Sequence, residues 1–131
     1  VVNENDTVAV DEMDHQTSFG DNDWLSAVVA SGIDADLLIV LSDIDGLFDK
    51  NPKKYADANL ISEVTEINEK ITGAAGGTGS RFGTGGMATK IKAMDRMINE
   101  GRKAVLANGK RPSIIFEILN GKQIGTLFHK K

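Results

Sequence analysis

A glycine-rich stretch that runs directly into a helical pattern limits the folding of this chain more than any other feature. The stretch is Gly73–Lys90 (GAAGGTGSRFGTGGMATK), with seven of the fourteen glycines in 131 residues. Apolar residues then recur at helical spacing, at Met87, Ile91, Met94, Met97 and Ile98. Glycine lets a backbone approach a ligand closely, and the first N–H groups of a helix have no partner within it. Because the helix dipole adds about half a positive charge there, the stretch predicts a phosphate site, with Lys90 one turn into the helix.

Two familiar phosphate-binding motifs do not fit this stretch. In the P-loop, a lysine precedes Ser or Thr, whereas here Lys90 follows Thr89. In the dinucleotide fingerprint, a strand leads directly into the glycines, and no strand pattern does so here. A flexible linker that happens to precede a helix remains an alternative at this point, because glycine-rich stretches are common.

Composition restricts the class of protein. The length and a hydrophobic content of 40% suit one domain or a large part of one. The net charge of −4 gives no reason to expect nucleic acid or an anionic membrane as a partner, and no apolar run approaches the roughly 20 residues of a membrane helix. There is no cysteine, and His15 and His129 form no metal or catalytic pattern. We expect a cytoplasmic protein.

Helix and strand patterns alternate along the chain. Helices are predicted over Gly20–Ser31, Met87–Glu100 and Ser113–Leu119, with one or two helical turns over Thr65–Thr72. Strands are predicted over Asp36–Leu41, Lys103–Ala107 and Ile124–Phe128, with a short edge strand over Leu60–Val64. This alternation predicts an α/β fold, a three-layer α/β/α arrangement with a mainly parallel open sheet.

Two of these elements carry a more detailed expectation. In the first helix, the apolar face is assigned to Trp24, Leu25, Val28 and Val29. In the first full strand, residues 37–41 are all apolar, which indicates a strand buried on both faces. Ahead of both, Val1–Val2 has the character of a strand end and Asn3–Phe19 that of a long acidic loop, so the chain is expected to be part of a longer domain.

Four polar clusters are expected to meet at one edge of the sheet, where open α/β sheets bind their ligands. They are Asn3–Asp6, Asp21–Asp23, Ser42–Asp43 and the glycine-rich stretch. Asp and Asn also favour turns and helix caps, so any one cluster alone is equally compatible with local structure. Phosphoryl transfer needs mainly positioning and positive charge, which these residues supply, whereas nucleophilic catalysis has little support.

Four stretches in this order resemble the glutamate 5-kinase family of the amino acid kinase superfamily. They are Asn3–Val8 (NENDTV), Gly20–Ala27 (GDNDWLSA), Leu41–Phe48 (LSDIDGLF) and Phe82–Lys90 (FGTGGMATK), and the ending Gly125–Phe128 (GTLF) also fits. A TGGM-like segment followed by lysine is shared with acetylglutamate kinase and isopentenyl phosphate kinase. The combination of NENDTV with GDND is what resembles the glutamate enzymes.

The resemblance implies phosphorylation of the glutamate side-chain carboxylate by ATP with Mg²⁺, the first step of proline synthesis. It implies that Asp6 and Asn22 bind L-glutamate, that Asp23 orients the catalytic lysines and that Lys90 offsets charge on the transferred phosphoryl group. No protein residue is assigned to a metal, and the acidic loop after Asp6 resembles a region where proline acts as a feedback inhibitor. The implied ATP-binding residues are Ser42, Asp43, Thr84, Gly85, Gly86, Met87, Ala88, Thr89 and Lys90.

The family's domain begins with a further half that has no counterpart in these residues. That half carries a glycine-rich phosphate loop, a second catalytic lysine and a serine that contacts glutamate. Residues 1–131 are therefore expected to be the C-terminal, nucleotide-binding half of one kinase domain, inactive alone, with an unpaired sheet edge that favours a homo-oligomer or complementation by the other half. The alternatives are an acetylglutamate kinase-like or other superfamily enzyme, and a non-catalytic nucleotide-binding or scaffold fragment.

Overall fold

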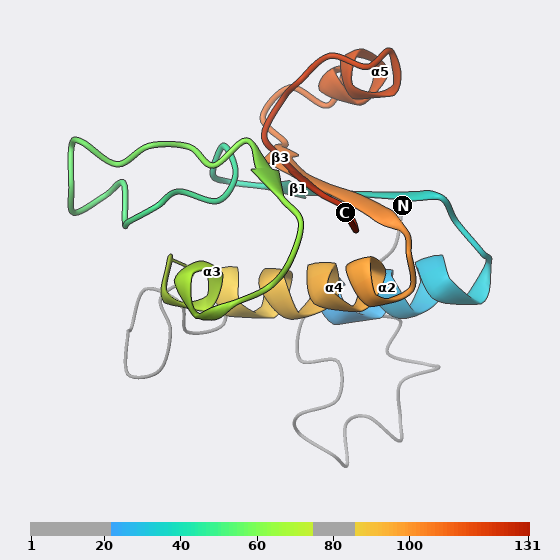
Figure 1. Ribbon diagram of the computed structural model, residues 1–131. Coiled ribbons are helices and arrows are strands. Elements are labelled where there is room, and N and C mark those ends of the chain that lie inside the picture. The colour runs from blue at the N-terminus through green and yellow to red at the C-terminus, as the bar shows by residue number, and fades with distance from the viewer. Residues whose placement is uncertain (1–21, 75–85) are drawn as a thin grey trace.

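The structure, a computed structural model, describes residues 22–74 and 86–131. The expected strand end Val1–Val2, the loop Asn3–Phe19 and most of the glycine-rich stretch lie outside these ranges. The described part contains four helices and four strands, in this order along the chain (Figure 1): α2 (Asn22–Gly32), β1 (Leu37–Ser42), β2 (Glu63–Val64), α3 (Glu69–Ala74), α4 (Ala88–Asn99), β3 (Lys103–Asn108), α5 (Ile114–Leu119) and β4 (Thr126–Phe128). Within these ranges, none of the helices has the length and apolar character needed to cross a membrane.

The strands form one sheet in the order β1-β3-β4-β2. β1 pairs parallel with β3, and β2 pairs parallel with β4, while β3 and β4 are antiparallel. The prediction of a mainly parallel sheet is confirmed, and β2 lies at an edge as expected. β1 and β3 each have six residues, close to their predicted bounds, whereas β4, with three residues, and β2, with two, are shorter than the apolar patterns suggested.

Alternate side chains of β3 divide the core into two layers. Ala104 and Leu106 pack into the cluster that includes the buried residues of α2 and α4. Val105 and Ala107 pack instead with residues of α5. Figure 1 shows α2 and α4 on one side of the sheet and α5 on the other. The three-layer α/β/α prediction is therefore confirmed.

The apolar stripe predicted for the helix after the glycine-rich stretch is buried along its whole length. Met87, just before α4, and the predicted positions within it are all among the buried residues of the core. Because residues three and four apart share one face of a helix, this stripe holds α4 flat on the sheet. The spacing of the apolar residues in the sequence therefore predicted the buried face of α4 correctly.

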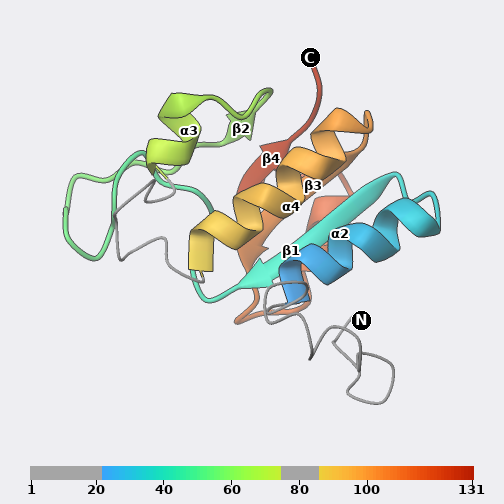
Figure 2. The ribbon, with the colours of Figure 1, turned by 90° about the horizontal axis from the view of Figure 1, so that it is seen from below.

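The apolar face predicted for α2 was wrong in part. The fully buried residues of this helix are Ala27 and Ala30, whereas the four larger side chains assigned to the face are only half-buried. Small side chains allow α2 to lie close beside α4, as Figure 2 shows. Trp24 lies at the outer side of this contact, where Lys92 Nζ and Arg96 Cζ are 5.2 Å and 5.3 Å from the ring centroid.

The expectation that β1 is buried on both faces holds only in part: its two faces pack against the two core layers, but most of its side chains are half-buried. Only Val40 is fully buried, and Leu41 is 37% exposed. β1 is one of the two edge strands of the described sheet, whereas β3 lies between two neighbours and has four consecutive buried residues. An apolar run reports hydrophobicity, but not the position of the strand in the sheet.

The segment just before β4 is tightly packed. Gly125 has a φ of 71°, and a Cβ at this position would collide with the carbonyl oxygen of Leu106. The fully buried hydroxyl of Thr126 donates to the Ile61 carbonyl at 2.6 Å and accepts from the Leu47 N–H at 2.9 Å. The GTLF ending therefore ties β4 to two other segments of the chain.

We expect Gly125→Ala to destabilise the fold more than Gly121→Ala. Both glycines have positive φ, 71° and 89°, which costs a residue with a Cβ about 1–2 kcal/mol. A Cβ at position 121 would meet nothing within 4 Å, whereas one at position 125 would collide with backbone. Urea unfolding of the two variants should show a free energy of unfolding that is lower for Gly125→Ala; equal losses would contradict the packing described.

Thr126→Val should lower the free energy of unfolding by about 2–3 kcal/mol, because it leaves two backbone groups unsatisfied in the core. Thr126→Ser keeps the hydroxyl and loses only a methyl group, for which we expect about 1 kcal/mol. Both values can be read from urea unfolding followed by circular dichroism. A serine variant less stable than the valine variant would show that the methyl group, and not the hydroxyl, matters here.

Candidate functional site

Two helix N-termini and two strand ends lie along one rim of the structure. β1 and β3 run parallel, and each follows a helix that crosses back over the sheet. The first turns of α2 and α4 therefore lie at the same end as the carboxyl ends of β1 and β3 (Figure 2). This is the edge where open α/β sheets bind ligands.

An ion pair joins the two helices at this rim. Lys90 Nζ lies 3.1 Å from Asp23 Oδ2, and the two side chains are only 17% and 16% exposed. Asp23 is in the first turn of α2, and Lys90 is in the first turn of α4. Removing Asp23 would deprive the shielded ammonium group of Lys90 of this counter-charge. The pair therefore holds the ammonium group at the start of α4.

Thr89 contacts both the ion pair and the backbone before α4. Its hydroxyl oxygen is 3.1 Å from Asp23 Oδ2 and 2.7 Å from the carbonyl oxygen of Gly86. A Cβ on Gly86 would meet no atom of the described residues within 4 Å. Met87, in contrast, has its side chain in the core, so only its backbone is available to a ligand.

Ser42 and Asp43 follow β1 at the same rim. The Ser42 hydroxyl donates to Asp43 Oδ1 at 3.2 Å, and the Ser42 carbonyl accepts from the Gly109 N–H at 2.8 Å. The two residues line a cavity of about 520 Å³ together with Leu41, Asn108, Gly109 and Lys110. The sequence analysis did not assign Asn108–Lys110 to the site. The parallel register that places Ser42 opposite Asn108 brings them there.

The structure brings some of the predicted site residues into contact and places others apart from them. Asp23, Thr89 and Lys90 are in mutual contact. Asn22 is exposed at the start of α2, beside Asp23, and Ala88 is exposed at the start of α4. The cavity beside Ser42 and Asp43 is not lined by the Asp23–Lys90 pair. Three predicted residues, Asp6, Thr84 and Gly85, lie outside the described residues.

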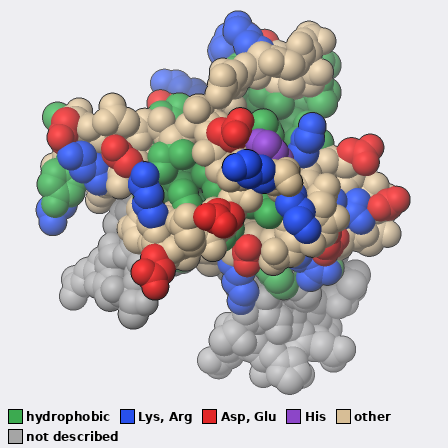
Figure 3. Space-filling model, in the orientation of Figure 1, with side chains coloured by type: hydrophobic (Ala, Val, Ile, Leu, Met, Phe, Trp, Pro, Cys, Tyr) green, Lys and Arg blue, Asp and Glu red, His purple; other side chains and the backbone are tan. Residues whose placement is uncertain are grey.

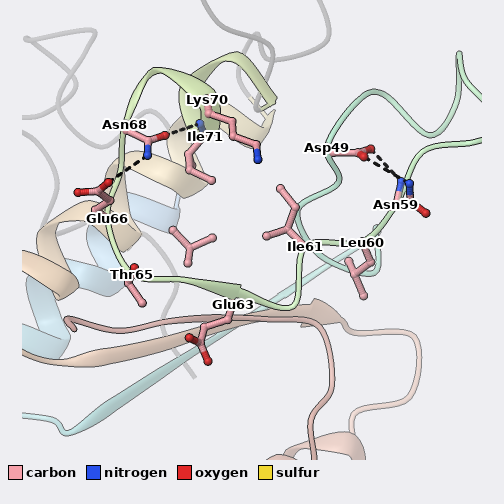
Figure 4. A pocket seen from close by; sticks show the side chains of 11 residues that line it. Asp49, Asn59, Leu60, Ile61, Glu63, Thr65, Glu66, Asn68, Lys70 and Ile71 are labelled. Carbon is pink, nitrogen blue, oxygen red and sulfur yellow. Dashed lines mark hydrogen bonds between the residues drawn. The ribbon is translucent and has the colours of Figure 1, made fainter.

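A second cavity, of about 400 Å³, lies between the chain before β2 and α3 (Figure 4). Several of its polar side chains bond to their neighbours: Asp49 accepts from the Asn59 backbone at 2.8 Å, and Asn68 donates to Glu66 at 3.2 Å. The backbone N–H of Asn59 lowers the pKa of Asp49 below its usual value. These hydrogen bonds stabilise the turns around the cavity.

Charges of both signs are interspersed on the face of the described residues that Figure 3 shows. The histidine on this face is His129, whose Nε2 lies 3.4 Å from Glu63 Oε1 across the β2–β4 pair. Over residues 22–74 and 86–131, no three His, Asp or Glu side chains gather where they would hold a metal ion.

The amino acid kinase family model matches residues 1–108. The chain is 99% identical over 131 residues to the glutamate 5-kinase of Ligilactobacillus salivarius, covering 100% of this chain and 49% of that protein. It is 60% identical over 130 residues to the glutamate 5-kinase of Enterococcus faecalis, covering 99% and 48%. It spans about half the length of these curated relatives.

A likeness in three dimensions accompanies the likeness in sequence. The product complex of the isopentenyl phosphate kinase of T. acidophilum superposes on the described fold with a TM-score of 0.61 and 26% identity, covering 82% of this chain and 39% of that chain. The resemblance noted from four short stretches is therefore confirmed. Since the family model covers most of the sequence and the α/β/α layers match those of a solved kinase, this chain belongs to the amino acid kinase family.

Proposed function

We propose that this chain forms the nucleotide-binding half of a kinase that transfers the γ-phosphoryl group of ATP to the side-chain carboxylate of glutamate. The observation that carries the proposal is the shielded Asp23–Lys90 pair at the joint N-termini of α2 and α4. The names of the curated relatives, both glutamate 5-kinases, support glutamate as the acceptor.

Lys90 and the start of α4 act on the phosphates in this proposal. In phosphoryl transfer, negative charge spreads over the oxygens of the transferred group, and catalysis works mainly by positioning and electrostatic stabilisation. A lysine ammonium and the unpaired N–H groups of a helix N-terminus both favour that charge. Asp23 holds the ammonium in place before the nucleotide binds.

The proposed reaction needs little acid–base catalysis from the protein. A carboxylate oxygen of glutamate attacks the γ-phosphorus, the bond from that phosphorus to the bridging oxygen breaks, and ADP leaves. The attacking carboxylate is already ionised at neutral pH, so no general base is needed. The described part of the rim offers a lysine, helix amides and polar side chains, which suit a transfer of this kind.

The cavity of about 520 Å³ beside Ser42 and Asp43 is where we place the nucleoside part of ATP. We propose that Mg²⁺ arrives bound to the phosphates, because magnesium keeps several waters and needs only one or two carboxylates besides the phosphates. When bound, the metal neutralises charge on the phosphates.

Glutamate lies next to the start of α2 in this proposal. The side-chain amide of Asn22 can donate to a carboxylate and accept from an ammonium group. We place Asp6 beside it, facing the substrate's ammonium group. From the relatives' function we further propose that the product enters proline synthesis in the cytoplasm, that proline inhibits the enzyme and that the enzyme assembles as a homo-oligomer.

Binding of ATP with Mg²⁺ to the 131-residue chain tests the nucleotide site. We expect measurable binding by calorimetry, and at least about tenfold weaker binding by Lys90→Ala, because a hydrogen bond to a charged group contributes about 1.5–3 kcal/mol. Lys92→Ala is the matched control, since Lys92 is exposed on the same helix. A folded chain that binds no ATP would favour the scaffold alternative, and equal losses in both variants would show only a general charge effect.

Glutamate-dependent formation of ADP tests the acceptor, in the protein at the full length of its curated relatives. Lys90→Ala should lower kcat about 100-fold or more, because a transition-state charge contact contributes about 2.7–4 kcal/mol. Lys92→Ala should stay near the unmodified rate, and residues 1–131 alone should be inactive. Turnover of N-acetylglutamate at an equal or higher rate would assign the protein to acetylglutamate kinase-like enzymes instead.

A further inference from the structure

The turns that follow β1 and β3 are joined by the side chain of Asn108. Its Oδ1 accepts from the backbone N–H of Lys110 at 2.8 Å, and its Nδ2 donates to Asp45 Oδ1 at 3.2 Å. The first bond lies within the turn after β3, whereas the second crosses to the turn after β1. One amide group thus connects the two chain segments that border the cavity of about 520 Å³.

This pair of bonds needs a side chain that has both a donor and an acceptor. A backbone N–H is a donor only, and an ionised carboxylate is an acceptor only. The Asn108 amide therefore has one favourable orientation, with its oxygen toward Lys110 and its nitrogen toward Asp45. An aspartate at this position would keep the first bond but place a second carboxylate beside Asp45.

Packing fixes both ends of the turn after β1, residues 43–46. Before the turn, the carbonyl of Ser42 accepts from the Gly109 N–H at 2.8 Å. After it, Gly46 is buried so closely that a Cβ at this position would lie 2.7 Å from Thr126 Oγ1. The ends of the turn are therefore attached to β3 and to β4.

The middle of this turn has less support. Ile44 is partly buried against the core, while Asp43 and Asp45 are exposed. Within the part of the chain that the structure describes, Asn108 makes the one side-chain hydrogen bond that reaches this turn from another strand. Without that bond, the Asp43 side chain would keep its contact with the neighbouring Ser42 hydroxyl, but the turn would lose its link to β3.

We propose that Asn108 is a positioning residue for nucleotide binding, whose amide holds the turn with Ser42 and Asp43 in place before the nucleotide arrives. This inference rests on the proposed function, which assigns the cavity to the nucleoside part of ATP. A turn that is already ordered costs less conformational entropy on binding, so a preformed site binds more tightly. The effect of Asn108 on the nucleotide passes through Asp45.

The first test measures the affinity of the 131-residue chain for ATP–Mg²⁺ by calorimetry. Asn108→Ala removes both bonds of the amide, so we expect about fivefold weaker binding, the effect of one ordinary hydrogen bond. Asn120→Ala is the matched control and should bind like the unmodified chain, because Asn120 is exposed at the end of α5 and does not line the cavity. Thermal unfolding of each variant checks that the fold is kept.

An exchange of the two side chains separates a role through Asp45 from any other role of Asn108. Asn108→Asp alone places like charges together and should bind ATP–Mg²⁺ at least about fivefold more weakly. Combined with Asp45→Asn, it restores the hydrogen bond with donor and acceptor reversed and keeps the net charge, so binding should return to within about twofold. Asp36→Asn in the Asn108→Asp background restores only the net charge, just before β1, and should leave binding weak.

Kinetics of the protein at the full length of its curated relatives give a second readout. Because the cavity is assigned to the nucleoside, Asn108→Ala should raise KM for ATP about fivefold and leave KM for glutamate within about twofold. The exchange variant should restore KM for ATP. A general loss of structure would instead change both KM values or lower the amount of active enzyme.

The outcomes separate the inference from the proposed function. If the unmodified chain binds ATP–Mg²⁺ and Asn108→Ala binds it equally well, the inference is overturned while the nucleotide site stands. A folded exchange variant that still binds weakly overturns it too, since Asn108 would then act without Asp45. If Asn108→Ala does not fold, the comparison of Asn108→Asp with the exchange variant decides alone. A folded, unmodified chain that binds no ATP–Mg²⁺ refutes the proposed function, and the inference that rests on it fails with it.

Discussion

The rim that we propose as the nucleotide site depends on one ion pair between residues that are 67 positions apart in sequence. Asp23 and Lys90 meet only because α2 and α4 lie side by side and start at the same end of the sheet (Figure 2). That alignment in turn requires the parallel pairing of β1 with β3 and the small side chains of α2. The position of the two charges thus depends on both the strand pairing and the close packing of the two helices.

The chain at the start of α4 combines a buried apolar side chain with polar side chains at the rim. Met87 is buried, whereas Thr89 and Lys90 reach the rim two and three residues later. Because successive helix residues point in directions about 100° apart, one turn can hold the helix in the core and still present two polar groups. A phosphate site built on such a turn has rigid support close to its donors.

Some of the motifs that resemble the kinase family are explained by packing of the fold, and others are not. In GTLF, Gly125 and Thr126 make backbone contacts that connect β4 with the rest of the fold, so this motif is explained by packing. In FGTGGMATK, Thr89 and Lys90 point to a carboxylate on another helix, which packing of α4 alone would not require. The second kind of motif is the one that indicates chemistry.

The sequence by itself determined the alternation of helices and strands, the buried stripe of α4 and the presence of a lysine at its start, because these follow from local spacing and from unpaired helix N–H groups. It did not determine that β1 is an outer strand, that Ala27 and Ala30 are the buried residues of α2, or that Asn108 lies opposite Ser42. Only the tertiary structure decided these points. Burial and contact depend on which segments become neighbours, and hydrophobicity along a chain carries no record of that choice. The shared oxygen of Asp23 is the sharpest case, since the distance between Thr89 and that atom exists only once the two helices have packed.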